Sequence, residues 1–221
     1  MVQLVPKSAS ANMEEDYQRL LALKEGDPPQ VHIYAWRAPS LTYGYFMRPE
    51  QWLDLAALKQ AGYETARRPT GGGILFHTHD LSFSVLIPKG HTSLSDNTLE
   101  NYRLINDKVK EAISPFIPEK SELLVSETPN SSFCMAQPTI YDVMVNGKKV
   151  GGAAQRRTRT GLLHQGTICL QTPDPEHLSR FLLNPNILTQ MQANSFSLQT
   201  PHDILAERLL LVFKGLCCNY S

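Results

Sequence analysis

The stretch that decides the fold is RRPTGGGILFHTHDLSFSVLIP, residues 67–88. It predicts a basic strand end, a glycine turn and then a pair of strands rich in β-branched and aromatic residues. Because glycine lacks a Cβ atom, the backbone of residues 71–73 can adopt positive φ angles and approach a ligand closely. N–H groups in such a turn can bind an anion, and Arg67 and Arg68 add charge and fork-shaped donors. Two interpretations of the turn stay open, a plain hairpin connection and a ligand-binding loop.

The composition is that of an ordinary globular protein. The chain has 221 residues, 42% of them apolar and 19% charged, which is enough for one α/β domain with a substantial core. Lys plus Arg and Asp plus Glu both number 21, and a formal net charge of zero favours neither nucleic acid nor an anionic membrane. No apolar run is long enough to span a membrane, and the N-terminus lacks the pattern of a secretory signal.

Hydrophobic periodicity, capping residues and turn signals predict alternating helices and strands. Five helices are expected, beginning at Ser10 or Asn12, at Pro49, at Asp96 or Asn97, at Asp174 and at Pro201. The second should end at Gly62 and the third at Ile113. The second should bury Trp52, Leu55 and Leu58, and the last should bury Ile204, Leu205, Leu209, Val212 and Phe213. Strands are expected over residues 31–34, 41–46, 123–125 and 162–170 and in a hairpin of residues 141–145 and 149–154. Asn146-Gly147 between these last two is the strongest hairpin signal in the chain.

Lys149 follows the hairpin turn and precedes two glycines. A lysine there can place its ammonium beside an acyl carbonyl or a phosphate oxygen, with a close glycine backbone beside it. Because strand side chains alternate, Lys148 is expected to point to the opposite face. A solvated hairpin lysine is the alternative interpretation of Lys149.

Four cysteines are present, namely Cys134, Cys169, Cys217 and Cys218. They form no Cys-x-x-Cys pair and no matched Cys/His ligand spacing, so we expect free thiols in a reducing cytoplasm. Cys134 can act as a nucleophile, since acyl transfer through a thiolate divides one difficult exchange into two easier ones. A buried, inert cysteine remains the alternative.

The histidines and one basic cluster are further candidates. His77 and His79 share a strand face, but a third ligand at suitable spacing is absent, so we expect no metal site. His164, at a strand start, can polarise or deprotonate a bound group. Arg156, Arg157 and Arg159 form a basic cluster that suits a solvated loop, an acidic partner protein or ATP phosphates.

Three segments together resemble the lipoate-protein ligase and octanoyltransferase family, relatives of biotin-protein ligases. The resemblance covers about residues 12–170. It includes Arg-Arg-Pro-Thr-Gly-Gly at residues 67–72, Tyr34-x-Trp36 and Tyr43-Gly44-Tyr45-Phe46 among the early strands, and Gly-Lys-Lys-Val-Gly-Gly-Ala-Ala-Gln at residues 147–155. The family implies a mixed, largely antiparallel sheet flanked by helices, with the acyl group in a tunnel between the sheet and the glycine loop. We expect one catalytic domain over residues 1–221, without the accessory C-terminal domain that many ligases of the family carry.

The family contains two chemistries. Octanoyltransferases pass octanoate from acyl carrier protein through a cysteine and need no cofactor, whereas lipoate ligases use ATP and Mg²⁺ to make an acyl-adenylate. Ser131-Ser132-x-Cys134-x-x-x-Pro138-x-x-Tyr141-Asp142 resembles the octanoyltransferase branch, and Cys134 falls on its nucleophile. Ala153 in place of a serine, the order His164-Gln165, and Gly73 depart from that branch. An inactive relative that binds an acyl group is therefore a further hypothesis.

The resemblance thus predicts which residues form the site. We expect catalytic roles for Cys134, Lys149 and His164. Contacts with octanoate or lipoate are expected from Arg67, Arg68, Thr70, Gly71, Gly72, Gly73, His77, Gly151, Gly152 and Ala153. The implied partners are a lipoyl carrier domain, either the E2 subunit of a 2-oxoacid dehydrogenase or the glycine cleavage H protein, and, for the octanoyltransferase branch, acyl carrier protein. We expect a monomer.

Overall fold

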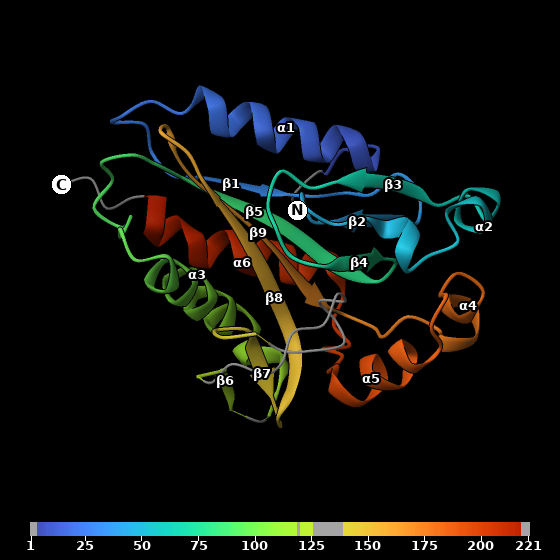
Figure 1. The fold of residues 1–221 in the computed structure, drawn as a ribbon. Coiled ribbons are helices and arrows are strands. Elements are labelled where there is room, and N and C mark those ends of the chain that lie inside the picture. The colour runs from blue at the N-terminus through green and yellow to red at the C-terminus, as the bar shows by residue number, and fades with distance from the viewer. Residues whose placement is uncertain (1–3, 119, 126–138, 218–221) are drawn as a thin grey trace.

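The computed structural model describes residues 4–118, 120–125 and 139–217. In this part of the chain, a central sheet has the strand order β1-β5-β9-β8-β7-β6, and its neighbouring strands are antiparallel. Its strands are β1 (Gln30–Ile33), β5 (Asp80–Pro88), β9 (Gly161–Cys169), β8 (Lys148–Arg157), β7 (Val143–Val145) and β6 (Ser121–Leu123). The long strands β5, β8 and β9 cross the middle of the molecule (Figure 1).

A second, smaller sheet contains the strands on either side of the glycine loop. Its order is β3 (Glu64–Arg67), β2 (Ser40–Tyr43) and β4 (Ile74–His77), with β2 parallel to β3 and antiparallel to β4. The predicted α/β fold with a largely antiparallel sheet is confirmed, although the strands are divided between two sheets. The predicted Asn-Gly hairpin joins β7 to β8, and both turn residues have positive φ angles, 51° at Asn146 and 70° at Gly147.

Helices cover both faces of the central sheet (Figure 1). They are α1 (Ala9–Ala22), α2 (Leu55–Gln60), α3 (Thr98–Ile113), α4 (Pro175–Ser179), α5 (Asn186–Asn194) and α6 (His202–Cys217), with 3-10 turns η1 (Pro49–Gln51) and η2 (Ser114–Phe116). A second apolar cluster joins the small sheet to α2, α4 and α5, and it includes Leu41, Leu58, Phe76, Leu178 and Met191. Over the described residues, no helix is long and apolar enough to cross a membrane.

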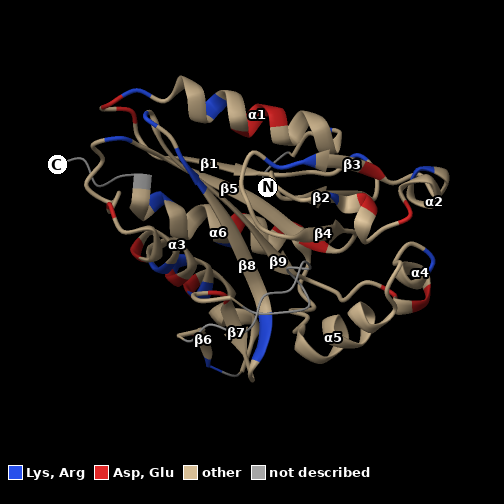
Figure 2. Ribbon diagram, viewed as in Figure 1, with Lys and Arg blue, Asp and Glu red and all other residues tan. Residues whose placement is uncertain are grey.

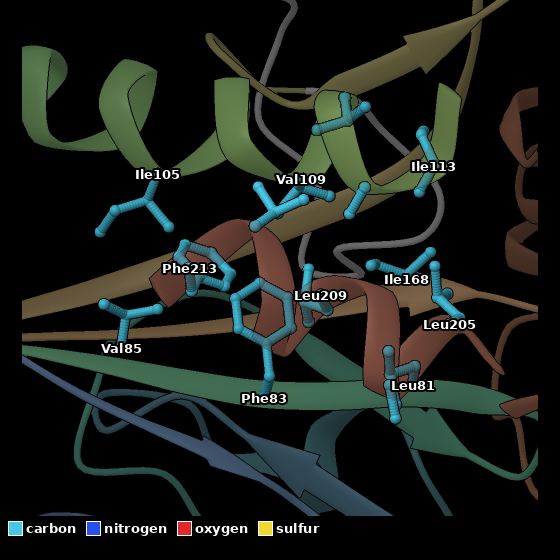
Figure 3. Packing of buried hydrophobic residues seen from close by; sticks show 14 of the residues in the cluster. Leu81, Phe83, Val85, Ile105, Val109, Ile113, Ile168, Leu205, Leu209 and Phe213 are labelled. Carbon is cyan, nitrogen blue, oxygen red and sulfur yellow. The ribbon is translucent and has the colours of Figure 1, made fainter. Parts of the chain in front are cut away.

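The two faces of the central sheet differ in chemistry because side chains alternate along β5. Phe83 and Val85 pack with Ile105 of α3 and Phe213 of α6 in the main core (Figure 3). We call this side the core face. Ser84 points the other way and donates to Asp16 of α1, at 2.8 Å. We call that side, covered by α1, the α1 face, and it carries several buried polar residues of β5 and β9, namely Ser82, Ser84, Gln165 and Thr167.

Several predicted boundaries differ from the structure. Helix α1 begins earlier than expected because Ser8 is its N-cap, with Oγ accepting from the backbone of Ala11. Asn12, one of the predicted caps, is buried and instead donates to the carbonyl of Ala35. Leu55 and Ile204 are exposed rather than inward, at 37% and 49%. Helix α5 was not predicted, because its sequence is rich in Asn and Gln and has few apolar positions.

Candidate active site

The glycine loop between β3 and β4 is held by Arg68. This residue is 4% exposed, and its guanidinium donates to the carbonyls of Gly71 at 3.1 Å and Gly73 at 2.7 Å. A further bond, at 2.9 Å, reaches Oγ1 of Thr42 on β2. Two bonds to loop carbonyls fix the shape of the loop from inside. Arg67 behaves differently, since it is exposed and lies 5.7 Å from the ring centroid of Tyr43.

The loop also packs directly on the end of β2. The backbone N–H of Gly44 donates to Gly73 at 3.2 Å, and that of Tyr45 donates to the carbonyl of Thr70 at 2.9 Å. A β-carbon on Gly44 would overlap the carbonyl oxygen of Gly72. Gly72 itself has a φ of +86°, a conformation that favours glycine. Gly44 is thus part of the site because its backbone packs directly on the glycine loop. In the sequence, the only indication of this role was its place in the motif Tyr43-Gly44-Tyr45-Phe46.

A buried network joins the loop to the α1 face of the central sheet. The Thr70 hydroxyl donates to Oε1 of Gln165 on β9 at 2.7 Å. The Gln165 amide then donates to Asp16 at 2.8 Å and to the hydroxyl of Tyr34 at 3.0 Å. Burial and the Asp16 carboxylate raise the pKa of Tyr34, so its hydroxyl stays protonated and donates to Asp16. Gln165 and Asp16 therefore place Thr70, although neither was predicted as a site residue.

His77 is part of a second polar cluster on the same face. Its Nδ1 pairs with Asp80 Oδ2 at 2.8 Å, its Nε2 contacts Thr42 Oγ1 at 2.7 Å, and its ring stacks on Trp36 with centroids 4.3 Å apart. The same Asp80 oxygen accepts from Thr167 at 2.6 Å. Burial acts to raise the pKa of Asp80, but His77 and two hydroxyl donors more than offset this and hold the pKa below its usual range. His77 thus links the small sheet to the central sheet.

Lys149 reaches the α1 face through a β-bulge. Val143 pairs with Gly151 and Met144 pairs with Lys149, so Val150 is the extra residue of β8. Val150 packs in the main core, and Lys149 therefore turns to the opposite face, where it is 4% exposed. Lys148 is exposed, as the alternation predicted. The backbone N–H of Phe196, after α5, donates to the carbonyl of Lys149 at 2.8 Å and holds the bulge.

The Lys149 ammonium lies over Gly152 and pairs with Asp142. The Nζ–Oδ2 distance is 2.7 Å, and both side chains are almost fully buried. Gly152 is opposite Thr167 in the β8–β9 ladder, so Lys149 and Thr167, which donates to Asp80, lie on adjacent strands and on the same face. Gln165, which binds the glycine loop, lies two residues from Thr167 on that face. Lys149, Gly152 and the Gln165 side chain that binds Thr70 of the glycine loop thus share one face of the sheet, on the adjacent strands β8 and β9.

Three predicted site residues point to the core face instead. His164 is fully buried beside the rings of Phe83 and Tyr102, at centroid distances of 6.2 and 5.7 Å. Burial lowers its pKa to about 3, so it is neutral at pH 7. Gly151 and Ala153 alternate with Gly152 and share the face of His164. The proposed catalytic assignment of His164 is corrected accordingly, because the sheet separates its side chain from Lys149.

Of the four cysteines, Cys169 is the one whose side chain the structure describes. Cys134 lies outside the described residues, as do Cys218 and the side chain of Cys217. Cys169 is 3% exposed, and burial together with the charge of Asp80 raises its pKa to about 12. A thiol with so high a pKa stays protonated and is a poor nucleophile.

The basic cluster lies away from Lys149. Figure 2 shows basic residues at both ends of β8, with Lys148 and Lys149 at one end and Arg156 and Arg157 at the other. Arg156 donates to the carbonyl of Pro69 at 3.0 Å and stacks between two tyrosine rings, and Arg157 pairs with Asp96 at 2.7 Å. In the described part of the chain, no three His, Cys, Asp or Glu residues are grouped as a metal site.

Comparison of sequences relates the chain to one family. The model of the lipoyl protein ligase A/B catalytic domain matches residues 8–200. The chain is 33% identical over 187 residues to octanoyltransferase LipM of Kyrpidia tusciae, covering 81% of this chain and 68% of that protein. It is 34% identical over 170 residues to octanoyltransferase LipM of Geobacillus kaustophilus, covering 72% and 60%. The chain thus spans less than two thirds of the length of the second relative.

Solved structures share the fold. A putative lipoate protein ligase from T. acidophilum with bound lipoic acid superposes with a TM-score of 0.75 at 23% identity, covering 97% of this chain and 84% of that one. A lipoate-protein ligase A bound with ATP gives a TM-score of 0.75 at 23% identity, covering 96% and 83%. At this identity the similarity concerns the fold alone.

Proposed function

Because this chain belongs to the lipoyl protein ligase A/B catalytic domain family, we propose that it transfers an octanoyl group to a lysine of a lipoyl carrier domain. The relatives named octanoyltransferase support this choice among the family's chemistries. One structural observation carries the proposal. Lys149 is buried over Gly152 on the sheet face that the glycine loop covers, where an acyl carbonyl would meet both a cation and a close backbone.

The proposed reaction has two steps through Cys134. The Cys134 thiolate attacks the carbonyl carbon of the octanoyl thioester on acyl carrier protein, and the carrier's thiolate leaves and takes up a proton. The amine form of the acceptor lysine then attacks the new thioester, and Cys134 leaves as thiolate while the amine loses a proton. Cys134 precedes Thr139 by five residues, and Thr139 donates its backbone N–H to Asp142, the partner of Lys149, at 2.6 Å. Five residues span at most about 18 Å, so the connection permits Cys134 to reach Lys149.

Lys149 has two roles in this scheme. Its ammonium favours the thiolate form of Cys134, because an opposite charge within about 4–6 Å stabilises the charged form. It also stabilises the negative charge that develops on the carbonyl oxygen in each step. The glycine loop, with Thr70 and Gly71 to Gly73, would enclose the acyl chain, and Gly152 leaves room for the lysine. His164 takes no part in the proposed steps.

The acceptor in this proposal is the lipoyl domain of an E2 subunit or the glycine cleavage H protein, and the protein acts in the cytoplasm as a monomer. No cofactor is required. The ATP-dependent ligase is the alternative, in which phosphate charge would fall on Lys149 and the arginines. Of these, Arg68 binds loop carbonyls, Arg156 binds the Pro69 carbonyl and Arg157 pairs with Asp96. These three arginines thus bind other groups of the protein, which supports the cofactor-free transferase.

One assay separates the hypotheses. Apo lipoyl domain is incubated with the protein and either octanoyl acyl carrier protein or lipoate, ATP and Mg²⁺, and the mass of the domain is measured. We expect a gain of one octanoyl group with the first donor and none with the second. A gain only with lipoate and ATP would establish the ligase. No gain with either donor would leave only the hypothesis of an acyl-binding relative.

The nucleophile is tested by substitution. Cys134→Ser is expected to slow transfer by several orders of magnitude and to abolish the octanoyl adduct seen in the intact mass of the enzyme. Cys169→Ala is the matched control, since Cys169 is a buried thiol with a raised pKa, and it should retain the adduct. Full activity of Cys134→Ser would overturn the thioester mechanism.

A further inference from the structure

The turn before β7 has a backbone conformation that its sequence disfavours. Tyr141 has a φ of +66°, in the left-handed region that bulky residues rarely adopt. Such a conformation is strained and persists only where the surrounding structure imposes it. Here the strained residue directly precedes Asp142, the ion-pair partner of Lys149. Contacts with the surrounding structure must therefore hold Tyr141 in this left-handed conformation.

Hydrogen bonds from three directions hold the turn. The N–H of Tyr141 donates to the carbonyl of Leu124 at 2.7 Å, and the N–H of Asp142 donates to the carbonyl of Thr139 at 2.9 Å. Asn106 of α3 supplies the third contact, with Nδ2 donating to the Tyr141 carbonyl at 2.8 Å. Asn106 is 3% exposed in a helix whose other buried residues are largely apolar. A buried amide is retained in such a place when it satisfies a specific partner.

The turn determines where the Asp142 carboxylate lies. Oδ2 accepts from the Thr139 N–H at 2.6 Å and pairs with Lys149 Nζ at 2.7 Å. Oδ1 would lie 3.0 Å from a β-carbon on Gly152. The carboxylate thus fixes the ammonium over Gly152 from the side. A change in the peptide between Tyr141 and Asp142 would move the carboxylate and the lysine together.

We propose that Asn106 is a positioning residue for the reaction, acting through the left-handed Tyr141 and Asp142 to hold the Lys149 ammonium where the acyl carbonyl binds. The inference rests on the proposed function, because it assumes that Lys149 acts on the acyl carbonyl. It assigns a kinetic role to a residue of α3 whose side-chain amide binds the turn that carries Asp142. A misplacement of about 1 Å in a catalytic group can slow a reaction about 100-fold, so a single hydrogen bond at this distance can matter.

The first test is Asn106→Leu, with Asn101→Leu as matched control. Both asparagines lie on α3 and are buried, but Asn101 bonds to Ser95 and Asn97 at the start of the helix. With the donor that the wild type accepts, we expect Asn106→Leu to lower kcat about 10–100-fold while the KM for the donor stays within about threefold. Asn101→Leu should lower the melting temperature and leave kcat within about threefold. Equal kcat in the two variants would overturn the inference.

A double-mutant cycle tests whether Asn106 acts through Asp142. In an Asp142→Asn background, Asn106→Leu should lower kcat by less than about twofold more, because the carboxylate that it positions is already lost. A multiplicative loss would show an independent structural effect and contradict the inference. A wild type that transfers no acyl group from any donor would instead refute the proposed function, so the two failures are distinguishable.

The turn itself provides a second pair of variants should Asn106→Leu not fold. Tyr141→Gly accepts the positive φ without strain and should therefore keep a kcat several-fold higher than that of Tyr141→Val. Tyr141→Val disfavours that φ and should lower kcat about 10-fold or more with little change in KM. The same kcat in both variants would show that the left-handed conformation does not position Lys149.

Discussion

The Lys149 ammonium occupies the space that a side chain on Gly152 would need. A β-carbon built on Gly152 would lie 2.5 Å from Lys149 Nζ and 3.0 Å from Asp142 Oδ1. Residue 152 must therefore be a glycine because the Lys149 ammonium fills the space of a side chain. Its backbone dihedral angles are not the reason. Lysine, aspartate and glycine form one unit on the face of the sheet that the glycine loop covers.

Gly152→Ala is predicted to displace Lys149 from the α1 face. The added methyl group would overlap Cε and Nζ of Lys149, so the ammonium must move away from Gly152. We expect kcat for octanoyl transfer to fall about 10–100-fold, since a catalytic group moved by about 1 Å loses this much. Steady-state kinetics with octanoyl acyl carrier protein measures the effect.

Gly215→Ala is the control for this prediction. A β-carbon on Gly215, in α6, would meet nothing within 4 Å, and alanine favours a helix over glycine by about 1 kcal/mol. This variant should melt at a higher temperature than the wild type with unchanged kcat. If Gly152→Ala also kept its kcat, the ammonium over Gly152 would have no role in the reaction.

Lys149→Arg and Lys148→Arg test the bulge that separates the two lysines. Lys149 is buried against Asp142 and Gly152, so the larger planar guanidinium cannot take the position of the ammonium. We expect Lys149→Arg to lower kcat at least about 100-fold. Lys148 is exposed, and Lys148→Arg should leave kcat unchanged within about twofold. Comparable losses in both variants would contradict the assignment of the α1 face as the site.

The sequence predicted the strands and turns that form the site better than it predicted which of their residues face one another. The glycine turn and the Asn-Gly hairpin have strong local signals, and Lys149 was predicted to face away from Lys148. Gly151 and Ala153 were also expected at the site, yet only Gly152 shares the face of Lys149, because the bulge at Val150 breaks the alternation. A bulge arises from packing between strands and has no clear mark in a single sequence.

Long-range hydrogen bonds were the other feature beyond the sequence. Asp16 and Gln165 are 149 positions apart, and the bond between them, which orients the Gln165 amide toward Thr70, exists only after α1 docks on the sheet. Asn106 belongs to a helix that was predicted correctly, from Asn97 to Ile113, but an amide that bonds to another element looks the same in a sequence as a solvated one. His164 was misassigned for a related reason, since only strand pairing decides the face on which a histidine lies.

Arg68→Met is predicted to loosen the glycine loop. It removes the guanidinium bonds to Gly71, Gly73 and Thr42 and leaves these buried oxygens without that donor. Loss of such bonds should lower the free energy of unfolding by about 2–4 kcal/mol and raise the KM for the acyl donor. Urea unfolding and steady-state kinetics measure the two effects.

Arg67→Met is the control, because Arg67 is exposed, and the free energy of unfolding of this variant should differ from that of the wild type by less than about 0.5 kcal/mol. Equal stability of the two variants would contradict the bracing role of Arg68.

His164→Leu is predicted to weaken the acid sensitivity of the fold without loss of transfer. The ordinary pKa of 6.5 applies to the unfolded chain, and burial lowers the pKa to about 3 in the folded protein. Between these values the unfolded state binds one more proton, so the stability that is present above pH 6.5 is lost as the pH falls toward 3. One proton corresponds to a slope of about 1.4 kcal/mol per pH unit.

Urea unfolding of the wild type and His164→Leu at a series of pH values between 7 and 4 measures this slope. The slope of the variant should be smaller than that of the wild type by up to about 1.4 kcal/mol per pH unit, which corresponds to one proton. At pH 8 the kcat of His164→Leu should remain within about threefold, because the side chain lies on the core face, away from Lys149. A fall in kcat of several orders of magnitude, with the fold intact, would restore His164 as a catalytic base and contradict its placement behind the sheet.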